Sequence, residues 1–255
     1  MTTSLLNSLL RALLRWGAAL VFCLPLRHRS HFWARACGML FPLLLLAQLL
    51  DPLAQSTTLW QQQLLLLVLY VSFFALLGGM IYLCTDINKK GAMYCAVWSL
   101  LIAQCAYEGW CFLELQFARY GHPLNMASPW AVLVQLLSGA VFFAAVYLLL
   151  ARQLPYKGEY HIGPRQLLSS FFIGSLFMVQ AAVLSDTSID SWPPSLVATL
   201  VTGQLYFLTL LYFQTELFKK SAMEKEMNAL NLLYERQRQQ YQVARQNVQI
   251  INKRC

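Results

Sequence analysis

Charged residues are scarce in this chain of 255 residues. They make up 12% of the sequence, against about 25% in soluble domains, while 58% of the residues are hydrophobic. A soluble protein of this composition would expose apolar patches larger than monomers tolerate. The scarcity of charge therefore excludes soluble globular and disordered folds and predicts a membrane protein.

The sequence also lacks the spacings of metal sites and of metal-dependent or redox enzymes. Its cysteines form no C-x-x-C pair and lie mostly in apolar runs, where free cysteine behaves as a small hydrophobic residue. Its histidines show neither H-x-x-x-H nor H-E-x-x-H spacing. We therefore expect no metal site and no catalytic residue in the chain. The histidines are His28, His31, His122 and His161, and the cysteines are Cys23, Cys37, Cys84, Cys95, Cys105, Cys111 and Cys255.

Long apolar segments fill the first 217 residues. A spanning helix needs about 20 predominantly apolar residues. Six segments meet this requirement, and a seventh, 4–25, is weaker. Polar residues at three- and four-residue steps, among them Arg11 and Arg15, give it one polar stripe. It either spans with this stripe turned into the bundle, which we favour, or lies in the interface. The prediction is an all-α, polytopic membrane bundle of six or seven transmembrane helices over 1–217, followed by a polar tail, residues 218–255. The six stronger segments are about 33–54, 60–84, 91–114, 129–151, 166–184 and 195–217.

The basic residues of the short loops predict the topology. Eight of them lie in alternate connections, and Arg119 alone lies in the opposite ones. Because basic loops stay on the cytoplasmic side, we expect a multi-pass membrane protein with a cytoplasmic tail. The basic residues behind the net charge of +8 lie mainly in these loops and in the tail, and they form no nucleic-acid-binding face. Membrane lipid is therefore an expected partner and nucleic acid is not. The eight residues are Arg27, Arg29, Arg35, Lys89, Lys90, Arg152, Lys157 and Arg165.

Few polar residues lie within the predicted spans, and these are the candidate binding residues. Glu108 lies inside the outer end of its predicted helix, a costly depth for a carboxylate and hence a functional position by default. The alternative is that it pairs with an arginine of segment 4–25 or reaches headgroup water. Gln104 and Gln180 are more simply explained by helix packing. The predicted ligand-binding residues, at the outer ends of two helices, are Glu108, Trp110, Glu114, Arg119 and Trp130.

The tail carries a heptad pattern of more than four repeats, which predicts a dimeric coiled coil. With Met227 as position a, apolar residues recur at steps of four and three. A single amphipathic helix on the membrane surface is the alternative, but a 3.5-residue period fits a partner helix better. Gln237, Ala244 and two tyrosines make the seam weak, which suits a joint that changes its packing. The seam consists of Met223, Met227, Leu230, Tyr234, Gln237, Tyr241, Ala244, Val248, Ile251 and Cys255.

The end of the tail resembles a known receptor family. The stretch Ile250-Ile251-Asn252-Lys253-Arg254-Cys255 is similar to the segment before the phosphoacceptor histidine of the accessory gene regulator (AgrC-type) quorum-sensing receptor histidine kinases. In that family Asn-x-x-Cys precedes His-Asp, and Asn252 and Cys255 match its first part. Residues 234–249 resemble the family's Gln-rich linker helix, and Gly91-Ala92-Met93-Tyr94 through Gln104 resembles its central membrane helix.

The resemblance implies the membrane sensor of a two-component histidine kinase with a GHKL ATPase domain, in the plasma membrane of a bacterium. The sequence stops one residue short of the expected histidine and holds neither the Asn-box nor the ATP-lid motif. We therefore expect the sensor and linker part of a longer kinase, with ATP and Mg²⁺ bound only by a kinase domain absent from this chain. The expected partners are a second copy, an extracellular peptide, by resemblance a cyclic thiolactone or lactone, and a cytoplasmic response regulator.

Two other functions remain open. One is a small membrane transporter or processing enzyme whose tail only dimerises it, and the other is a membrane-anchored adaptor without a ligand. A transporter or protease should carry paired intramembrane acids or an H-E-x-x-H helix. The sequence contains neither pattern, which favours the receptor.

Overall fold

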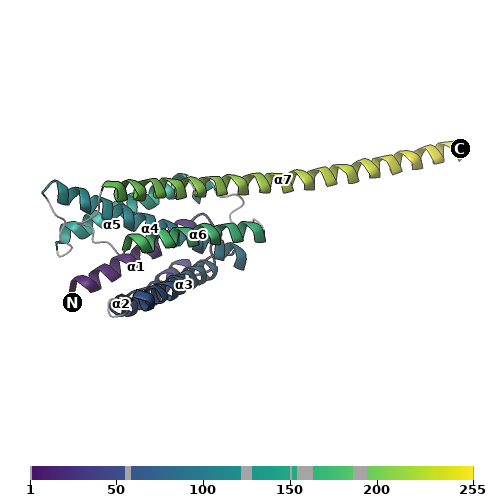
Figure 1. The fold of residues 1–255 in the computed structure, drawn as a ribbon. Helices are drawn as coiled ribbons and strands as arrows, with labels where there is room; N and C mark the ends of the chain where they lie inside the picture. The colour runs from purple at the N-terminus through teal and green to yellow at the C-terminus, as the bar shows by residue number, and fades with distance from the viewer. Residues whose placement is uncertain are drawn as a thin grey trace. The chain divides into compact units, whose positions relative to one another are not determined.

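The computed structural model describes residues 2–54, 59–121, 128–149, 151–153, 163–185 and 194–254, and the predicted all-helical fold is confirmed (Figure 1). Helices account for nearly all of the described residues, and the β-structure among these residues is one isolated bridge between His28 and Thr85. The elements in chain order are α1 (Thr2–Cys23), α2 (Phe32–Ala54), α3 (Leu59–Cys84), α4 (Lys89–Arg119), α5 (Pro129–Leu149), the short 3₁₀ helix η1 (Ala151–Gln153), α6 (Pro164–Ser185) and α7 (Pro194–Arg254).

Five of these helices are long and apolar enough to cross a membrane, namely α1, α3, α4, α5 and the Val197–Gln214 stretch of α7. The described residues of α2 and α6 contain shorter apolar stretches, Phe32–Gln48 and Gln166–Phe177. This set of helices fits the membrane protein expected from composition. The number of spans, six or seven, stays a prediction.

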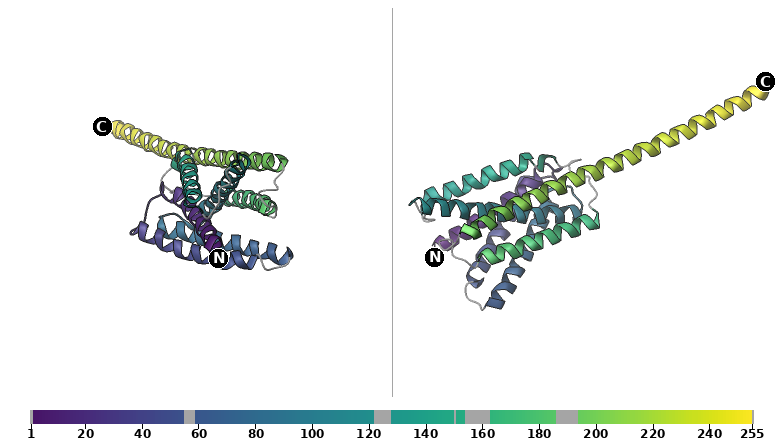
Figure 2. Two further views of the ribbon diagram at one scale, coloured as in Figure 1. Left: turned by 90° about the vertical axis from the view of Figure 1, so that its left-hand side faces the viewer. Right: turned by 45° about the horizontal axis from the view of Figure 1, so that its top comes forward.

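The chain divides into two compact units, Met1–Tyr212 and Phe213–Cys255. In the first unit, α4 packs against α1, α3, α5 and α6, and α2 lies beside α3 in both orientations of Figure 2. The span of α4 is 72% buried, although α4 is the least apolar of the five candidate spans. The most apolar, α5, is only 17% buried. This inversion is expected in lipid, because polar side chains are tolerated inside the bundle and apolar ones face the acyl chains.

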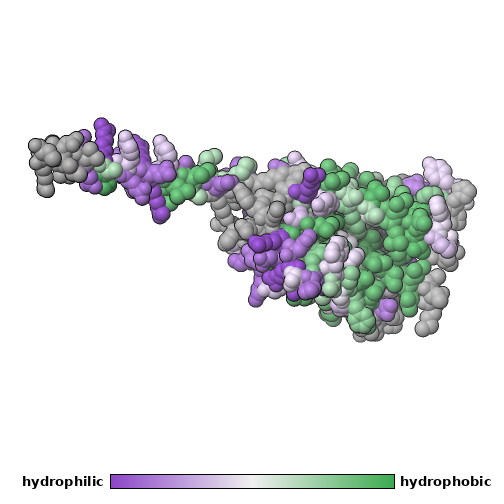
Figure 3. Space-filling model, turned by 180° about the vertical axis from the view of Figure 1, so that it is seen from behind, coloured by the Kyte–Doolittle hydropathy of each residue, from purple (hydrophilic) through white to green (hydrophobic). Residues whose placement is uncertain are grey.

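The surface of the first unit follows the same rule. Figure 3 shows hydrophobic residues covering most of the visible face of the bundle, while hydrophilic residues gather at one end. Exposed apolar side chains come from several helices, including Phe41 of α2, Val71 of α3 and Val141 of α5. A belt of this kind matches a lipid-facing surface and would be a liability in water.

Two loops are tied together at one end of α1 to α4. The backbone N–H of Asp86 donates to the carbonyl of Arg27 (2.9 Å), and that of Arg29 donates to the carbonyl of Cys84 (3.0 Å). The Arg29 guanidinium also lies 3.6 Å from the Asp86 carboxylate. Arg35 of α2 donates from Nη1 to the carbonyl of Leu83 (2.8 Å), one of the last carbonyls of α3, which have no partner within the helix. These contacts, which we call the loop clamp, fix the connection α1–α2 to the connection α3–α4.

The second unit is the remainder of α7. Every described side chain from Met223 onward is exposed. Charged and amide side chains predominate among them, so this stretch of helix has little apolar surface with which to pack on itself. Its predicted coiled-coil pairing needs a second chain and stays a prediction.

Candidate functional site

A buried carboxylate in α4 is the centre of the polar interior. Glu108 is only 4% exposed. Its Oε1 accepts a hydrogen bond from Gln104 Nε2 (3.2 Å), one turn earlier on the same helix, and its Oε2 accepts one from Gln204 Nε2 of α7 (2.7 Å). Each carboxylate oxygen thus accepts from one amide. The shorter hydrogen bond joins α4 to α7 through two residues that are 96 positions apart in the sequence. Within the first unit, Glu108 therefore fixes α7 to the central helix.

The arginines of α1 lie on the same side of the interior. Arg11 Nη2 donates to the hydroxyl of Tyr107 (2.9 Å), and its guanidinium carbon lies 4.8 Å from the centroid of that ring. The guanidinium carbon of Arg15 lies 3.9 Å from the ring centroid of Phe73 in α3. Cation–π contacts of this kind strengthen when they are desolvated. The polar stripe of α1 is therefore turned into the bundle, as the spanning alternative requires.

The five residues predicted to bind a ligand differ in their accessibility. Glu108 and Trp110 are buried, the latter at 2% exposure, and the Trp110 indole N–H has no hydrogen-bond partner among the described residues. Glu114 is partly exposed, and Arg119, in the last turn of α4, is exposed. Trp130, the second residue of α5, is 63% exposed. A ligand arriving from outside would meet the last three residues first, and the ligand-binding role of all five stays a prediction.

The predicted seam of the tail is accessible wherever its side chains are described. Met223, Met227, Leu230, Tyr234 and Tyr241 are between 58% and 72% exposed, and Gln237 and Ala244 are also exposed. The side chains of Val248 and Ile251 and all of Cys255 lie outside the described residues. The seam is thus available to a partner helix, but its pairing is not tested by a single chain.

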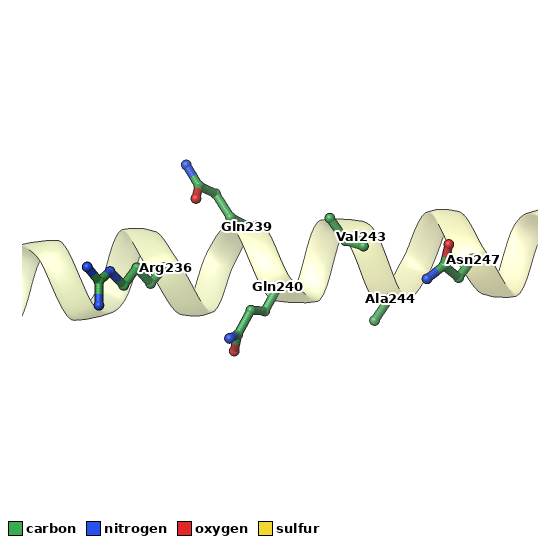
Figure 4. Close-up of a pocket in the computed structure, with 6 residues that line it drawn as sticks. All are labelled: Arg236, Gln239, Gln240, Val243, Ala244 and Asn247. Carbon is green, nitrogen blue, oxygen red and sulfur yellow. The ribbon is translucent and has the colours of Figure 1, made fainter.

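A shallow groove runs along the tail helix (Figure 4). Its lining comes from one helix only: Arg236, Gln239, Gln240, Val243, Ala244 and Asn247. A binding site for a small molecule is normally concave and encloses most of its ligand, which the side of one helix cannot do. We therefore assign this groove no ligand.

The polar interior includes contacts between helices. Among the described residues, no group of three or more His, Cys, Asp or Glu side chains is placed to hold a metal ion. The interior instead offers a carboxylate held by two amides and an arginine held by a tyrosine. These contacts join α4 to α7 and to α1.

Reasoning from sequence missed Gln204 and Tyr107, although one signal was available. Gln204 is an amide inside an otherwise apolar span, and polar side chains in spans commonly bond to neighbouring helices. The sequence pattern did not indicate which helix Gln204 would bond to. Comparison of this chain with protein-family models, with curated proteins and with solved structures found no match.

Proposed function

We propose that this chain is the membrane sensor and linker region of a two-component signal-transducing histidine kinase. It detects an extracellular cyclic peptide and passes the signal to a cytoplasmic kinase domain through its last helix. Two observations from the sequence support this proposal, namely the heptads of the tail and the AgrC-type resemblance around Asn252 and Cys255. The kinase domain, with its ATP and Mg²⁺, and the response regulator are implied by that resemblance alone.

The observation that carries the proposal is the continuity of α7. One helix, Pro194–Arg254, includes both the stretch that hydrogen-bonds to Glu108 and the heptads of the tail. A helix transmits rotation, tilt or translation along its length, whereas a loop would absorb it. The proposed mechanism follows from this difference: a ligand changes the packing around Glu108, Gln204 responds, and α7 moves relative to its neighbours.

The ligand is proposed to bind where α4 ends and α5 begins. Arg119 and Trp130 offer an exposed cation and an exposed aromatic ring, and Glu114 is partly exposed one turn closer to the interior. Glu108 and Trp110 lie deeper along the same helix. Arg119 and Trp130 would therefore contact the peptide directly. The packing of Glu108 and Trp110 would change when the peptide binds.

A phase experiment tests the relay. We fuse the chain in frame to the catalytic part of a histidine kinase whose response regulator drives a reporter gene, and insert one, two, three or seven alanines after Gln237. Each inserted residue turns the following helix by about 100°, so one to three insertions should alter the output in a phase-dependent way. Seven insertions restore the heptad frame and should restore the output. A response that ignores the phase would favour the transporter or adaptor alternatives.

A binding experiment tests the ligand site. The probe is a synthetic library of cyclic thiolactone and lactone peptides, with the linearised peptides as chemical controls, and the readout is the same reporter. Alanine at Arg119 and Trp130 together should weaken the response to an active peptide. Alanine at Leu148, exposed at the other end of α5, is the matched control. An undiminished response in the double variant would contradict the proposed position of the ligand.

A further inference from the structure

The membrane stretch of α7 is the least buried of the five candidate spans. Only 12% of the Val197–Gln214 stretch is buried, against 72% for the span of α4. Three residues of this stretch contact the bundle or are buried in it. Phe207 packs edge-on against Phe177 of α6, with ring centroids 4.4 Å apart, Leu211 is buried, and Gln204 binds Glu108. Other side chains around the helix are exposed, among them Val201, Thr202 and Tyr206.

One exposed face of this stretch carries hydroxyl and aromatic side chains at regular spacing. Thr199, Thr202, Tyr206, Thr209 and Phe213 are all exposed, and they follow one another at steps of three and four. Every threonine between 197 and 212 belongs to this set. Side chains facing only acyl chains need no hydroxyl groups, whereas Thr at helix interfaces allows close approach and hydrogen bonding across the contact.

These five residues also occupy the heptad frame of the tail. Counted back from Met227 as a, they fall at a, d, a, d and a. The residues that face the bundle, Gln204, Phe207 and Leu211, fall at f, b and f. At about 100° per residue, positions f and b lie opposite the seam between a and d. The span of α7 therefore has one face for its own bundle and an opposite face in the frame of the predicted dimer.

We propose that this exposed face of α7 is a membrane-embedded homodimer interface, in which Thr202, Tyr206 and Thr209 pack against the same residues of a second copy. The inference rests on the proposed function, since it extends the dimer from the tail into the membrane. An identical helix is the fitting occupant, because a 4–3 seam meshes with another helix of the same period. The hydroxyl of Thr209 already donates to the carbonyl of Leu205 (2.7 Å), so the donor is satisfied and the oxygen can accept from the partner.

Two charged residues follow the membrane part of this seam. Glu216 falls at d and Lys220 at a, one turn apart and of opposite sign. In a parallel pair of helices a faces a and d faces d, so each of these residues lies opposite its own copy and can reach the opposite charge of the partner only one layer along the seam. The parallel arrangement follows instead from topology, since two copies inserted in the same direction place both tails on one side of the membrane.

Disulfide trapping in membranes tests the interface. The background is the full chain with Cys37→Ser and Cys255→Ser, which removes the exposed cysteine and the one that the predicted seam contains. The remaining cysteines are at most 4% exposed. Copper phenanthroline oxidises neighbouring thiols, and a product at twice the mass of 29.1 kDa on a non-reducing gel reports a dimer.

Single cysteines are placed on the two faces. In the span, Thr202→Cys and Thr209→Cys lie in the seam, and Val201→Cys, also exposed but at position c, is the matched control. In the tail, Tyr234→Cys lies in the seam and Leu232→Cys, at f, is its control. We expect cross-linking at Thr202 and Thr209 to exceed that at Val201 several-fold, and cross-linking at Tyr234 to exceed that at Leu232.

Different cross-linking results would contradict the membrane interface and the coiled coil of the tail. Cross-linking at Tyr234 but not at Thr202 or Thr209 would overturn the membrane interface and leave the dimeric tail intact. Equal cross-linking at Val201 and Thr202 would likewise overturn it, because contact would then lack a preferred face. Cross-linking in the span with none in the tail would keep the interface and contradict the coiled coil of the proposed function.

Discussion

Replacing Gln204 by leucine removes the contact that joins α7 to the central helix. The Gln204 Nε2 to Glu108 Oε2 distance of 2.7 Å is short for a hydrogen bond from nitrogen, as charge-assisted bonds are. Leucine nearly preserves the volume of glutamine and suits an apolar span. The substitution therefore tests the hydrogen bond rather than the packing of α7.

The size of the effect follows from what remains around Glu108. After Gln204→Leu, Oε2 loses its partner at a site that is 4% exposed, while Oε1 keeps its 3.2 Å bond from Gln104. Leaving a buried group unsatisfied costs about 1–3 kcal/mol, and interhelical bonds in membranes average about 0.6 kcal/mol with a maximum near 1.7. We expect a loss of about 1–2 kcal/mol. Gln104→Leu likewise leaves Oε1 without its partner, but the bond that it removes is longer (3.2 Å) and lies within one helix, so we expect a smaller loss, about 0.5–1 kcal/mol.

Thermal unfolding in detergent micelles measures the difference. A dye that fluoresces on reaction with thiols reports unfolding, because Cys95, Cys105 and Cys111 are buried in the folded bundle. For a chain of this size, 1 kcal/mol corresponds to about 2–4 °C in Tm. A double-mutant cycle of Glu108→Gln with Gln204→Leu then isolates the coupling between the two positions. A coupling near zero, or a larger loss in Gln104→Leu than in Gln204→Leu, would refute the reasoning.

Three further predictions use the same preparation. Asn88→Ala removes the side-chain cap that accepts from the backbone N–H of Gly91 (2.7 Å) and should cost about 1 kcal/mol, whereas Asn88→Ser keeps an acceptor and should melt near the wild type. Gly91→Ala should lower Tm because its Cβ would lie 2.6 Å from two atoms of the Ile87 side chain, while Gly109→Ala, with nothing within 4 Å, should raise stability by about 0.5–1 kcal/mol through helix propensity; a reversed order would contradict this packing. A maleimide should label Cys37 in the folded protein and leave the buried cysteines unlabelled until denaturation, as mass spectrometry of labelled peptides would show.

The positions of the helices were predictable from hydropathy, but the C-terminal end of α4 was not. The apolar pattern predicted a helix over 91–114, and α4 runs from Lys89 to Arg119. Hydropathy detects the part of a helix that suits lipid, whereas backbone hydrogen bonding continues through polar residues such as Gln116 and Arg119. At the other end, the Asn88 cap fixes where α4 begins.

The sequence predicted that Glu108 would have a polar partner in the interior, but not which residue that partner would be. Sequence reasoning singled out Glu108 as a costly carboxylate and offered an arginine of α1 as one possible partner. In the structure, Arg11 donates to Tyr107, the neighbour of Glu108, and amides hold the carboxylate. The choice between arginine and amide depends on how α1 and α7 are rotated against α4. Rotation is set by packing across helices far apart in the sequence, which hydropathy does not encode.

The contact between Arg11 and Tyr107 also affects how the chain is synthesised. The two residues are separated by 96 positions, so at about 5–20 residues per second the ribosome needs roughly 5–20 s to supply the partner of an arginine already made. During that interval α1 carries a polar stripe with no helix α4 to receive it. A helix with such a polar stripe suits the lipid–water boundary better than the lipid interior while it is alone. The contact between Arg11 and Tyr107 therefore forms only after α4 has been made, although α1 leaves the ribosome well before α4.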